Sequence, residues 1–206
     1  ILQLTNPRAR RILESANELQ GGTHLKRLPF VLRLKNGAHP DFEALRPALS
    51  ALQTENFSIW GIQDFLFCYG EYPDDTAPEA LNALIDPLAC ERFADPGTLP
   101  LMYHDIGVVR ADKSLIRHRV FATHLRPGCA DEYKRRHDAL IAARGDKISE
   151  GPESNFTIWN ANGFIFGYCE LVRAFDREPT DSERAATIAW ETRQLEIMDW
   201  LTDDVD

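Results

Sequence analysis

Residues 56–71 read NFSIWGIQDFLFCYGE and residues 155–170 read NFTIWNANGFIFGYCE, so one segment occurs twice in the chain. The two stretches share eight identities over sixteen ungapped positions. Upstream of them, residues 30–46 (FVLRLKNGAHPDFEALR) align without gaps on residues 121–137 (FATHLRPGCADEYKRRH). Self-similarity of this kind indicates an internal duplication, in which each copy is one structural unit.

Each copy carries the hydrophobic pattern of a β-α-β-β-α unit. We predict strands where short apolar runs are bounded by turn residues, and helices where apolar residues recur at helical spacing. In the first copy, strands are expected at 29–34, 56–60, 65–71 and 101–109, and helices at 40–52 and 78–94. In the second copy, strands are expected at 119–125, 154–160 and 164–172, and helices at 130–144 and 181–201, with no fourth strand.

Two local signals refine this pattern. Pro47 argues against a long regular helix in the first copy, because an interior proline removes a backbone hydrogen bond. Asn162 followed by Gly163 predicts a tight hairpin between the last two strands of the second copy. Residues 6–20 predict a helix outside the repeat, which begins at Asn-Pro.

The order of elements predicts an α+β fold of two tandem ferredoxin-like β-α-β-β-α repeats. We expect the repeats to pack sheet on sheet as an intrachain α+β barrel, a pseudo-dimer to which further homodimerisation could be added. The predicted domains are an N-terminal helical extension (1–27), a first repeat with a degenerate site (28–110) and a second repeat with the candidate catalytic site (111–206). Residues 1–4 have the alternation needed to pair with the open edge of the second sheet, and a disordered terminus explains them equally well.

The composition excludes some classes of binding partner. The net charge of −9 at pH 7 argues against nucleic acid or an anionic membrane surface, because both favour clustered Lys and Arg. No apolar stretch approaches the roughly 20 residues that span a bilayer. The four cysteines show neither CxxC spacing nor the density of a disulfide scaffold. We therefore expect reduced thiols in a cytoplasmic protein.

The two copies differ at residues suited to chemistry. Tyr133 and His137 in the second copy align with Phe42 and Arg46 in the first. Because Tyr133 and His137 are four residues apart, they project from one helical face. An imidazole titrates near neutrality and a phenol donates or accepts a hydrogen bond, so the pair suits proton transfer at a sugar oxygen. An exposed helix face with an incidental histidine gives the same pattern.

Residues 121–137, with NFTIW at 155–159 and FIFGYCEL at 164–171, resemble the L-rhamnose mutarotase family. In that family a strand ending near Pro leads into a helix reading EYxRRH, and an Asn-Tyr-x-Ile-Tyr strand follows. The resemblance implies a ferredoxin-like α+β barrel that interconverts the α and β anomers of an aldose without metal or cofactor. It also implies that His137 is the proton donor and that Tyr133 binds the sugar.

The chain departs from the family pattern at two points. Phe156 replaces a sugar-binding tyrosine, which keeps the aromatic face and loses the hydroxyl. The adjacent tryptophan pair of the family's last helix is absent, and a single Trp200 lies displaced from that position. Because a site built around a substrate hydroxyl discriminates sharply by it, these changes weigh against L-rhamnose itself as the substrate.

Repeated residues supply further candidates for the site. The predicted substrate-binding residues are Phe156, Trp159, His124, Tyr168 and Trp200. Trp159, His124 and Tyr168 align with Trp60, Arg33 and Tyr69 of the first copy, so core packing or solvent exposure explains these three as well. Glu71 and Glu170 also repeat, and ion pairs at strand ends are a commoner role for such carboxylates than catalysis. The other histidines, at 24, 39, 104 and 118, form no metal-ligand spacing, so we expect no metal site.

The sequence therefore predicts an aldose mutarotase-like isomerase that acts on a monosaccharide by His/Tyr acid-base chemistry without a cofactor. Two alternatives belong to other classes of protein. One is a non-catalytic protein that binds a sugar or another metabolite. The other is a small α+β-barrel monooxygenase-type enzyme. Fold alone cannot choose among them, because function resides in the site.

Overall fold

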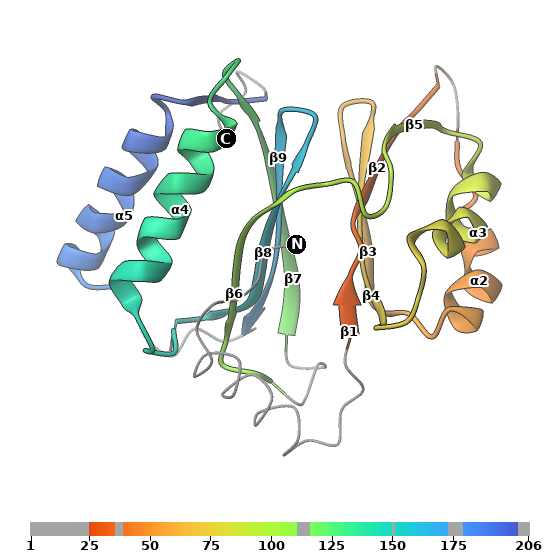
Figure 1. Ribbon diagram of the computed structural model, residues 1–206, viewed down its shortest axis with the longest axis horizontal. Coiled ribbons are helices and arrows are strands. Elements are labelled where there is room, and N and C mark those ends of the chain that lie inside the picture. Colours follow the sequence, from red (N-terminus) through yellow and green to blue (C-terminus); the bar gives the residue numbers. More distant parts are fainter. Residues whose placement is uncertain (1–24, 36–38, 111–115, 150, 173–178, 202–206) are drawn as a thin grey trace. The chain divides into compact units, whose positions relative to one another are not determined.

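The computed structural model describes residues 25–35, 39–110, 116–149, 151–172 and 179–201 (Figure 1). The chain divides into two compact units, and the boundary falls between Arg92 and Phe93. Each unit is an antiparallel sheet with its helices on one face, so the expected α+β class is confirmed. The helix predicted at 6–20 and the edge strand considered at 1–4 lie outside the described residues, and the packing of one sheet on the other stays a prediction.

The first sheet has the strand order of a split β-α-β unit. β1 (Leu25–Arg27) and β2 (Phe30–Arg33) pair in succession with one edge of β4 (Phe65–Pro73), and β3 (Glu55–Ile62) pairs with its other edge. β5 (Glu91–Ala94) lies beside β2, which gives the order β5-β2-β4-β3. Residues 25–27 are therefore a strand of this sheet, and their assignment to the helical extension was wrong.

The helices of the first unit are short. Residues 40–52 form a 3-10 turn, η1 (Phe42–Leu45), and one short helix, α2 (Arg46–Ala51), with Pro47 in its first turn. The interruption expected from Pro47 is thus confirmed. The helix predicted at 78–94 was wrong: the segment forms three short pieces and then β5. The three pieces are η2 (Pro78–Leu81), α3 (Asn82–Ile85) and η3 (Asp86–Leu88).

The second unit is more regular. β7 (Ile116–Leu125), α4 (Ala130–Arg144), β8 (Glu153–Ala161), β9 (Phe164–Val172) and α5 (Asp181–Gln194) follow in the predicted order. α5 begins with a capping box, in which the Thr180 hydroxyl accepts from the Glu183 backbone N–H and the Glu183 carboxylate accepts from the Thr180 backbone N–H. Both helices cover the same face of the sheet (Figure 1).

Two strands of the second sheet differ from the sequence prediction. β10 (Met198–Asp199) pairs antiparallel with β7 at Leu125 and His124, so a fourth strand exists where none was expected. β6 (Leu101–Gly107) pairs with β8, although we had assigned residues 101–109 to the first repeat. The resulting order is β10-β7-β9-β8-β6, in which β6 extends the sheet beyond the four strands of a ferredoxin-like unit.

A bulge that both sheets share explains one repeated pair of residues. Asn56 and Asn155 have positive φ values of 49° and 48°, and the strand register shifts beside each of them. The Asn56 amide donates to Glu71 Oε2 at 2.8 Å, and the Asn155 amide donates to Glu170 Oε1 at 3.1 Å. Asparagine tolerates the left-handed conformation that such a bulge requires. The repeated glutamates therefore anchor the bulges.

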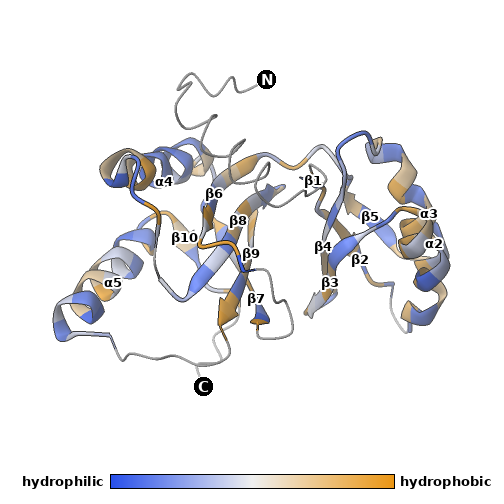
Figure 2. Ribbon diagram, turned by 90° about the horizontal axis from the view of Figure 1, so that it is seen from below, coloured by the Kyte–Doolittle hydropathy of each residue, from blue (hydrophilic) through white to orange (hydrophobic). Residues whose placement is uncertain are grey.

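The predicted hairpin is present. β8 and β9 are joined by two residues, Asn162 and Gly163, whose φ values of 52° and 97° are both positive, and Asn160 Oδ1 accepts a hydrogen bond from Gly163 N at 2.8 Å. Between the second sheet and its helices lies a core cluster of Met102, Leu125, Tyr133, Ile158, Ile165 and Ile197. Figure 2 shows hydrophilic and hydrophobic residues mixed along α4 and α5. No helix in the described part of the chain is long and apolar enough to cross a membrane.

The bulge predicts distinct effects for two substitutions at Asn155. Asn155→Gly keeps the backbone conformation but loses the bond to the buried Glu170, so it should destabilise the protein by about 1.5–3 kcal/mol. Asn155→Ala also forces a Cβ into the left-handed region and should cost about 1 kcal/mol more. Urea denaturation of both variants measures the difference. Equal stability of the two variants would show that the backbone conformation is not the constraint.

Candidate functional site

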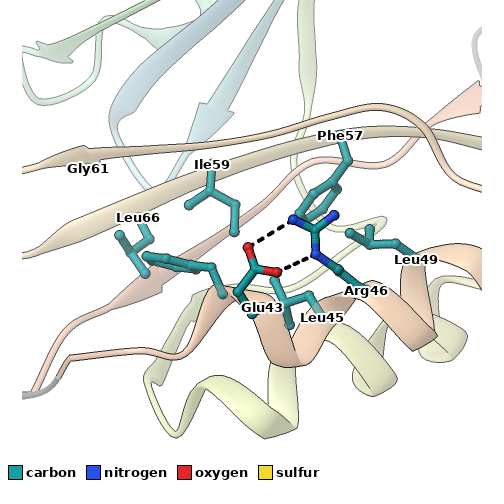
Figure 3. Close-up of a pocket in the computed structure, with 9 residues that line it drawn as sticks. Glu43, Leu45, Arg46, Leu49, Phe57, Ile59, Gly61 and Leu66 are labelled. Atoms are coloured by element: carbon teal, nitrogen blue, oxygen red, sulfur yellow. Dashed lines mark hydrogen bonds and ion pairs between the residues drawn. The ribbon is translucent and has the colours of Figure 1, made fainter.

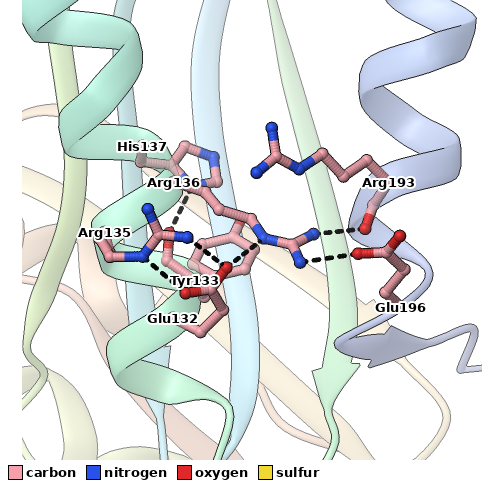
Figure 4. A network of polar contacts seen from close by, with 7 residues as sticks. All are labelled: Glu132, Tyr133, Arg135, Arg136, His137, Arg193 and Glu196. Carbon is pink, nitrogen blue, oxygen red and sulfur yellow. Dashed lines mark hydrogen bonds and ion pairs between the residues drawn. The ribbon is translucent and has the colours of Figure 1, made fainter.

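The candidate site centres on two side chains of α4. Tyr133 and His137 lie one turn apart, with ring centroids separated by 4.3 Å and ring planes inclined by 31°. Both side chains point from α4 toward the sheet (Figure 4), and their exposed fractions are 3% and 5%. The incidental exposed histidine that the sequence left open is therefore excluded. His137 is a buried group between helix and sheet.

One hydrogen bond fixes the tautomer of His137. Its Nδ1 lies 3.0 Å from the Tyr133 carbonyl oxygen, and only an N–H can bond a carbonyl, so Nδ1 carries the proton. In the neutral imidazole, Nε2 then holds the free lone pair. Burial lowers the pKa of His137 from its usual value of 6.5, although the bond to the Tyr133 carbonyl opposes the shift. At neutral pH the side chain is thus mainly a neutral base.

Aromatic rings surround the imidazole. Tyr103 of β6 and Trp190 of α5 meet it edge-on, with centroids 5.4 Å and 5.3 Å from it. Phe156 of β8 lies behind Tyr103, at 5.5 Å. The ring of Phe121 meets Phe156 at 6.0 Å and crosses β9 at Gly167, where a Cβ would collide with it. The predicted residues Tyr133, His137 and Phe156 are therefore brought together.

Sequence reasoning missed Tyr103 and Trp190. Tyr103 stands outside the repeated segments, and no local pattern tells which strand its own strand pairs with. Trp190 had a usable signal, because it lies on a predicted helix that a ferredoxin-like unit places beside α4. We chose Trp200 instead, because it is near the position of the family's tryptophan pair. Trp200 is 63% exposed, so it takes no part in this cluster.

A polar chain holds Tyr103. Its hydroxyl lies 3.4 Å from Asp105 Oδ2, which makes a long hydrogen bond. Asp105 also accepts from the Gly107 backbone N–H at 3.0 Å and forms an ion pair with Arg144 at the end of α4. Burial, followed by the negative charge of Asp105, raises the pKa of Tyr103. Burial likewise raises the pKa of Tyr133, so both phenols keep their protons at neutral pH.

Arg136 joins α4 to the end of α5 (Figure 4). Its guanidinium, 7% exposed, donates to Glu132 at 2.8 Å, to Glu196 at 2.8 Å and to the Arg193 carbonyl oxygen. Hydrogen bonds from Arg135 and Arg136 lower the pKa of Glu132 to about 2. The network fixes the end of α5 against α4, and it thereby helps to hold Trp190 over His137.

The other predicted residues lie on the opposite face of the sheet. Ile158, Ile165 and Leu125 pack with Tyr133 on the helix side. Successive side chains of a strand alternate, so Trp159 and His124, each adjacent to one of these residues, point away from the helices. Tyr168 points the same way, because its neighbour Gly167 pairs with Ile158. The structure therefore does not bring Trp159, His124 or Tyr168 together with His137.

The first unit has a pocket at the equivalent place. Its volume is about 500 Å³, and it lies between α2 and the sheet (Figure 3). Phe42, Arg46 and Phe57 stand where the second unit has Tyr133, His137 and Phe156. Arg46 forms a bidentate ion pair with Glu43, which raises the pKa of Arg46 and lowers that of Glu43. The other lining residues are Leu45, Leu49, Ile59, Gly61 and Leu66.

The described residues contain no group of three or more His, Cys, Asp or Glu side chains placed to hold a metal ion. The four cysteines are unpaired, and Cys68 and Cys169 are buried. Burial raises the pKa of both thiols, so they stay protonated. None of the four contributes to the ring cluster around His137.

A family model described as L-rhamnose mutarotase matches residues 118–205. The match lies within the second unit and includes α4 with Tyr133 and His137, so the resemblance drawn from the sequence is confirmed for this half. The match relates the second half of the chain to the sugar mutarotase family. Tyr103 and the whole first unit lie outside the matched residues. No curated protein and no solved structure matches the chain.

The Arg136 network can be tested against a neighbour on the same helix. Arg136→Met removes a buried guanidinium with three partners, so it should destabilise the second unit by about 2 kcal/mol and speed amide exchange in α5. Arg135→Met removes an exposed ion pair with the same Glu132 and should change little. Hydrogen exchange by mass spectrometry resolves α5 in both variants. Equal protection of α5 in the two variants would contradict the role given to Arg136.

Proposed function

We propose that this protein is an aldose mutarotase-like enzyme whose working site is the His137 cluster of the second unit. The observation that carries the proposal is the pairing of a neutral imidazole, with Nε2 free to accept a proton, and two phenols that keep theirs. Mutarotation needs one base and one acid at the same carbon centre. The family match of this half to sugar mutarotases supports the same reaction.

In the proposed reaction, His137 Nε2 removes the proton from the anomeric hydroxyl. The O1 lone pair forms the C1=O1 double bond as the C1–O5 bond breaks, and O5 takes a proton from a phenol. Rotation about C1–C2 turns the other face of the aldehyde toward O5. The reverse proton transfers then close the ring as the other anomer. Protons and electrons balance within the site, so the overall change is an isomerisation.

We assign the phenol role to Tyr103 and an orienting role to Tyr133. Tyr103 is only half-buried, and its hydroxyl makes only a long bond to Asp105, so its O–H can turn from Asp105 to O5. Tyr133, in contrast, is 3% exposed and stacks on the imidazole. Phe156 would supply an apolar wall for a sugar face. The resemblance gave His137 the donor role, but burial favours its neutral form, so we give it the acceptor role in the first step. Trp159, His124, Tyr168 and Trp200 have no role in this site.

Substrate entry requires Trp190 to move. His137 is 5% exposed, and Trp190 lies edge-on to it. α5 has few buried residues, since all of residues 181–189 are exposed, so small displacements of this helix break few contacts. An opening of α5 of this kind would admit a monosaccharide while keeping water away from the closed site.

The central prediction concerns His137 and its counterpart in the first unit. His137→Gln keeps a side chain of similar volume but loses the base, so it should slow anomeric exchange by about 10²–10⁴-fold. Arg46→Gln, at the equivalent position, should leave exchange unchanged, because the residues that line the first pocket include no imidazole and no phenol. Saturation-transfer NMR of the anomeric protons of L-rhamnose, D-glucose, D-galactose and D-ribose measures the rates.

The same measurement separates the alternatives. A sugar-binding protein without activity would shift sugar resonances and leave the wild-type exchange at the buffer rate. A haem- or flavin-type monooxygenase would show visible absorbance after purification. Wild-type exchange that survives in His137→Gln would remove His137 from the mechanism.

The pH dependence follows from the direction of the His137 shift. A lowered pKa means that the neutral base is already formed at pH 7 and is lost only as the pH falls through a value below 6.5. The exchange rate should therefore be flat from about pH 7 to about pH 9, where the phenols still hold their protons, and should fall in acid. Circular dichroism at each pH confirms folding. A rate that rises as the pH falls below 6.5 would restore the donor role to His137.

A further inference from the structure

The last residue of α5 has a buried amide that no described residue bonds. Gln194 is 3% exposed, and neither its Oε1 nor its Nε2 has a hydrogen-bond partner among the residues that the structure describes. Its backbone carbonyl is satisfied by the Ile197 N–H at 2.9 Å, so the side chain alone is left over. Buried polar groups are almost always hydrogen-bonded, because burying them without a partner is unfavourable. An unpartnered amide therefore calls for an explanation.

The position of Gln194 connects it to the His137 cluster. Residues four apart on a helix share a face, so Gln194 lies one turn beyond Trp190, which contacts His137. The neighbouring Arg193 carbonyl and Glu196 are bonded by Arg136 of α4. These contacts hold this end of α5 against the helix that carries Tyr133 and His137. Ile197, three residues beyond Gln194, belongs to the mostly aliphatic core cluster that also contains Tyr133.

We propose that the Gln194 carboxamide recognises two adjacent hydroxyls of the aldose whose anomeric centre meets His137. The proposal rests on the proposed function and adds a residue that sets specificity. A carboxamide has one acceptor oxygen and two N–H donors. Oε1 accepts from one hydroxyl and Nε2 donates to its neighbour, which is the pattern that a vicinal diol presents. Neither group is charged, so the amide suits a neutral sugar rather than a sugar phosphate.

This assignment predicts opposite effects on stability and on binding. An amide that is bonded within the protein stabilises the fold, so replacing it lowers the melting temperature. An amide that bonds only a ligand is unsatisfied in the free protein. Replacing it with an apolar side chain of the same shape removes a buried unsatisfied group, so the melting temperature stays the same or rises. Functional residues of this kind commonly lower stability in the free protein.

The test compares Gln194→Met with Thr192→Met, an exposed position on the same helix. Gln194→Met should melt at or above the wild-type temperature. Its KM for anomeric exchange should rise about tenfold to hundredfold, the effect of losing two hydrogen bonds, while kcat changes much less. Thr192→Met should resemble the wild type in both measurements. The sugar is the aldose on which the wild type is fastest. Removing its 2-hydroxyl or 3-hydroxyl, in the 2-deoxy and 3-deoxy analogues, should weaken binding to the wild type more than binding to Gln194→Met.

Two results would overturn the assignment. One is a Gln194→Met protein that melts well below the wild type and keeps the wild-type KM, which would show a structural amide bonded through ordered water only. The other is an equal response to parent and deoxy sugars. Gln194→Leu, of similar volume, repeats the measurement should the Met variant fold poorly. Failure of the proposed function is distinct, because the wild type would then leave every sugar at the buffer exchange rate, and it would overturn this proposal too.

Discussion

The guanidinium of Arg136 is the constraint on which the second unit's site depends. It is 7% exposed and stays protonated at any relevant pH, so it must find acceptors inside the protein. It finds them on both helices, at Glu132, Glu196 and the Arg193 carbonyl. Because Glu196 and the Arg193 carbonyl flank the end of α5, satisfying the cation also sets where Trp190 and Gln194 lie. The end of a surface helix with few buried residues is thereby held beside α4.

The two halves show how one scaffold supports two different interiors. Each has a helix over a sheet, with matched strands and the same Asn-Glu bulge. In the first unit, Pro47 and a 3-10 turn shorten that helix. Arg46 pairs there with Glu43 at a pocket whose other lining residues are apolar. In the second unit, a longer helix, Trp190 and Tyr103 fill the equivalent space with rings around a basic nitrogen.

Most of the fold could be predicted from the sequence, because the hydrophobic pattern of each repeated strand and helix occurs twice in the chain. Both hairpins, the second unit's helices and the break at Pro47 followed from local pattern, although the prediction of α5 up to residue 201 was wrong because the helix ends at Gln194. β10 escaped detection because two residues are too short to show alternation. β6 was seen as a strand but assigned to the wrong sheet, since its alternation is the same whichever partner it pairs with. Pairing between distant strands is decided by tertiary packing, which a single sequence does not display.

The candidate site was predicted only in part, for a geometric reason. Tyr133 and His137 share a helical face, as their spacing of four residues predicted. Phe156 and Trp159 are three residues apart in one strand, so alternation alone puts them on opposite faces. Treating both as walls of one cleft ignored that constraint. Trp190 lies on a helix that the ferredoxin-like order places beside α4. Which face of α5 meets α4, and hence where Gln194 lies, depends on Arg136 and on no pattern within α5 itself.

Burial acts on the second unit's site in one consistent direction. It lowers the pKa of His137 and raises the pKa of Tyr133 and Tyr103, so each shift favours the uncharged form. The charged groups nearby, Asp105 with Arg144 and Arg136 with Glu132, are paired with one another. A site of neutral donors and acceptors has no group to offset the desolvation of a phosphate or carboxylate, whereas an uncharged polyol loses far less on entering it. The same neutrality is what the proposed mechanism needs, because a neutral imidazole and a neutral phenol a few ångströms apart do not exchange a proton before a sugar hydroxyl lies between them.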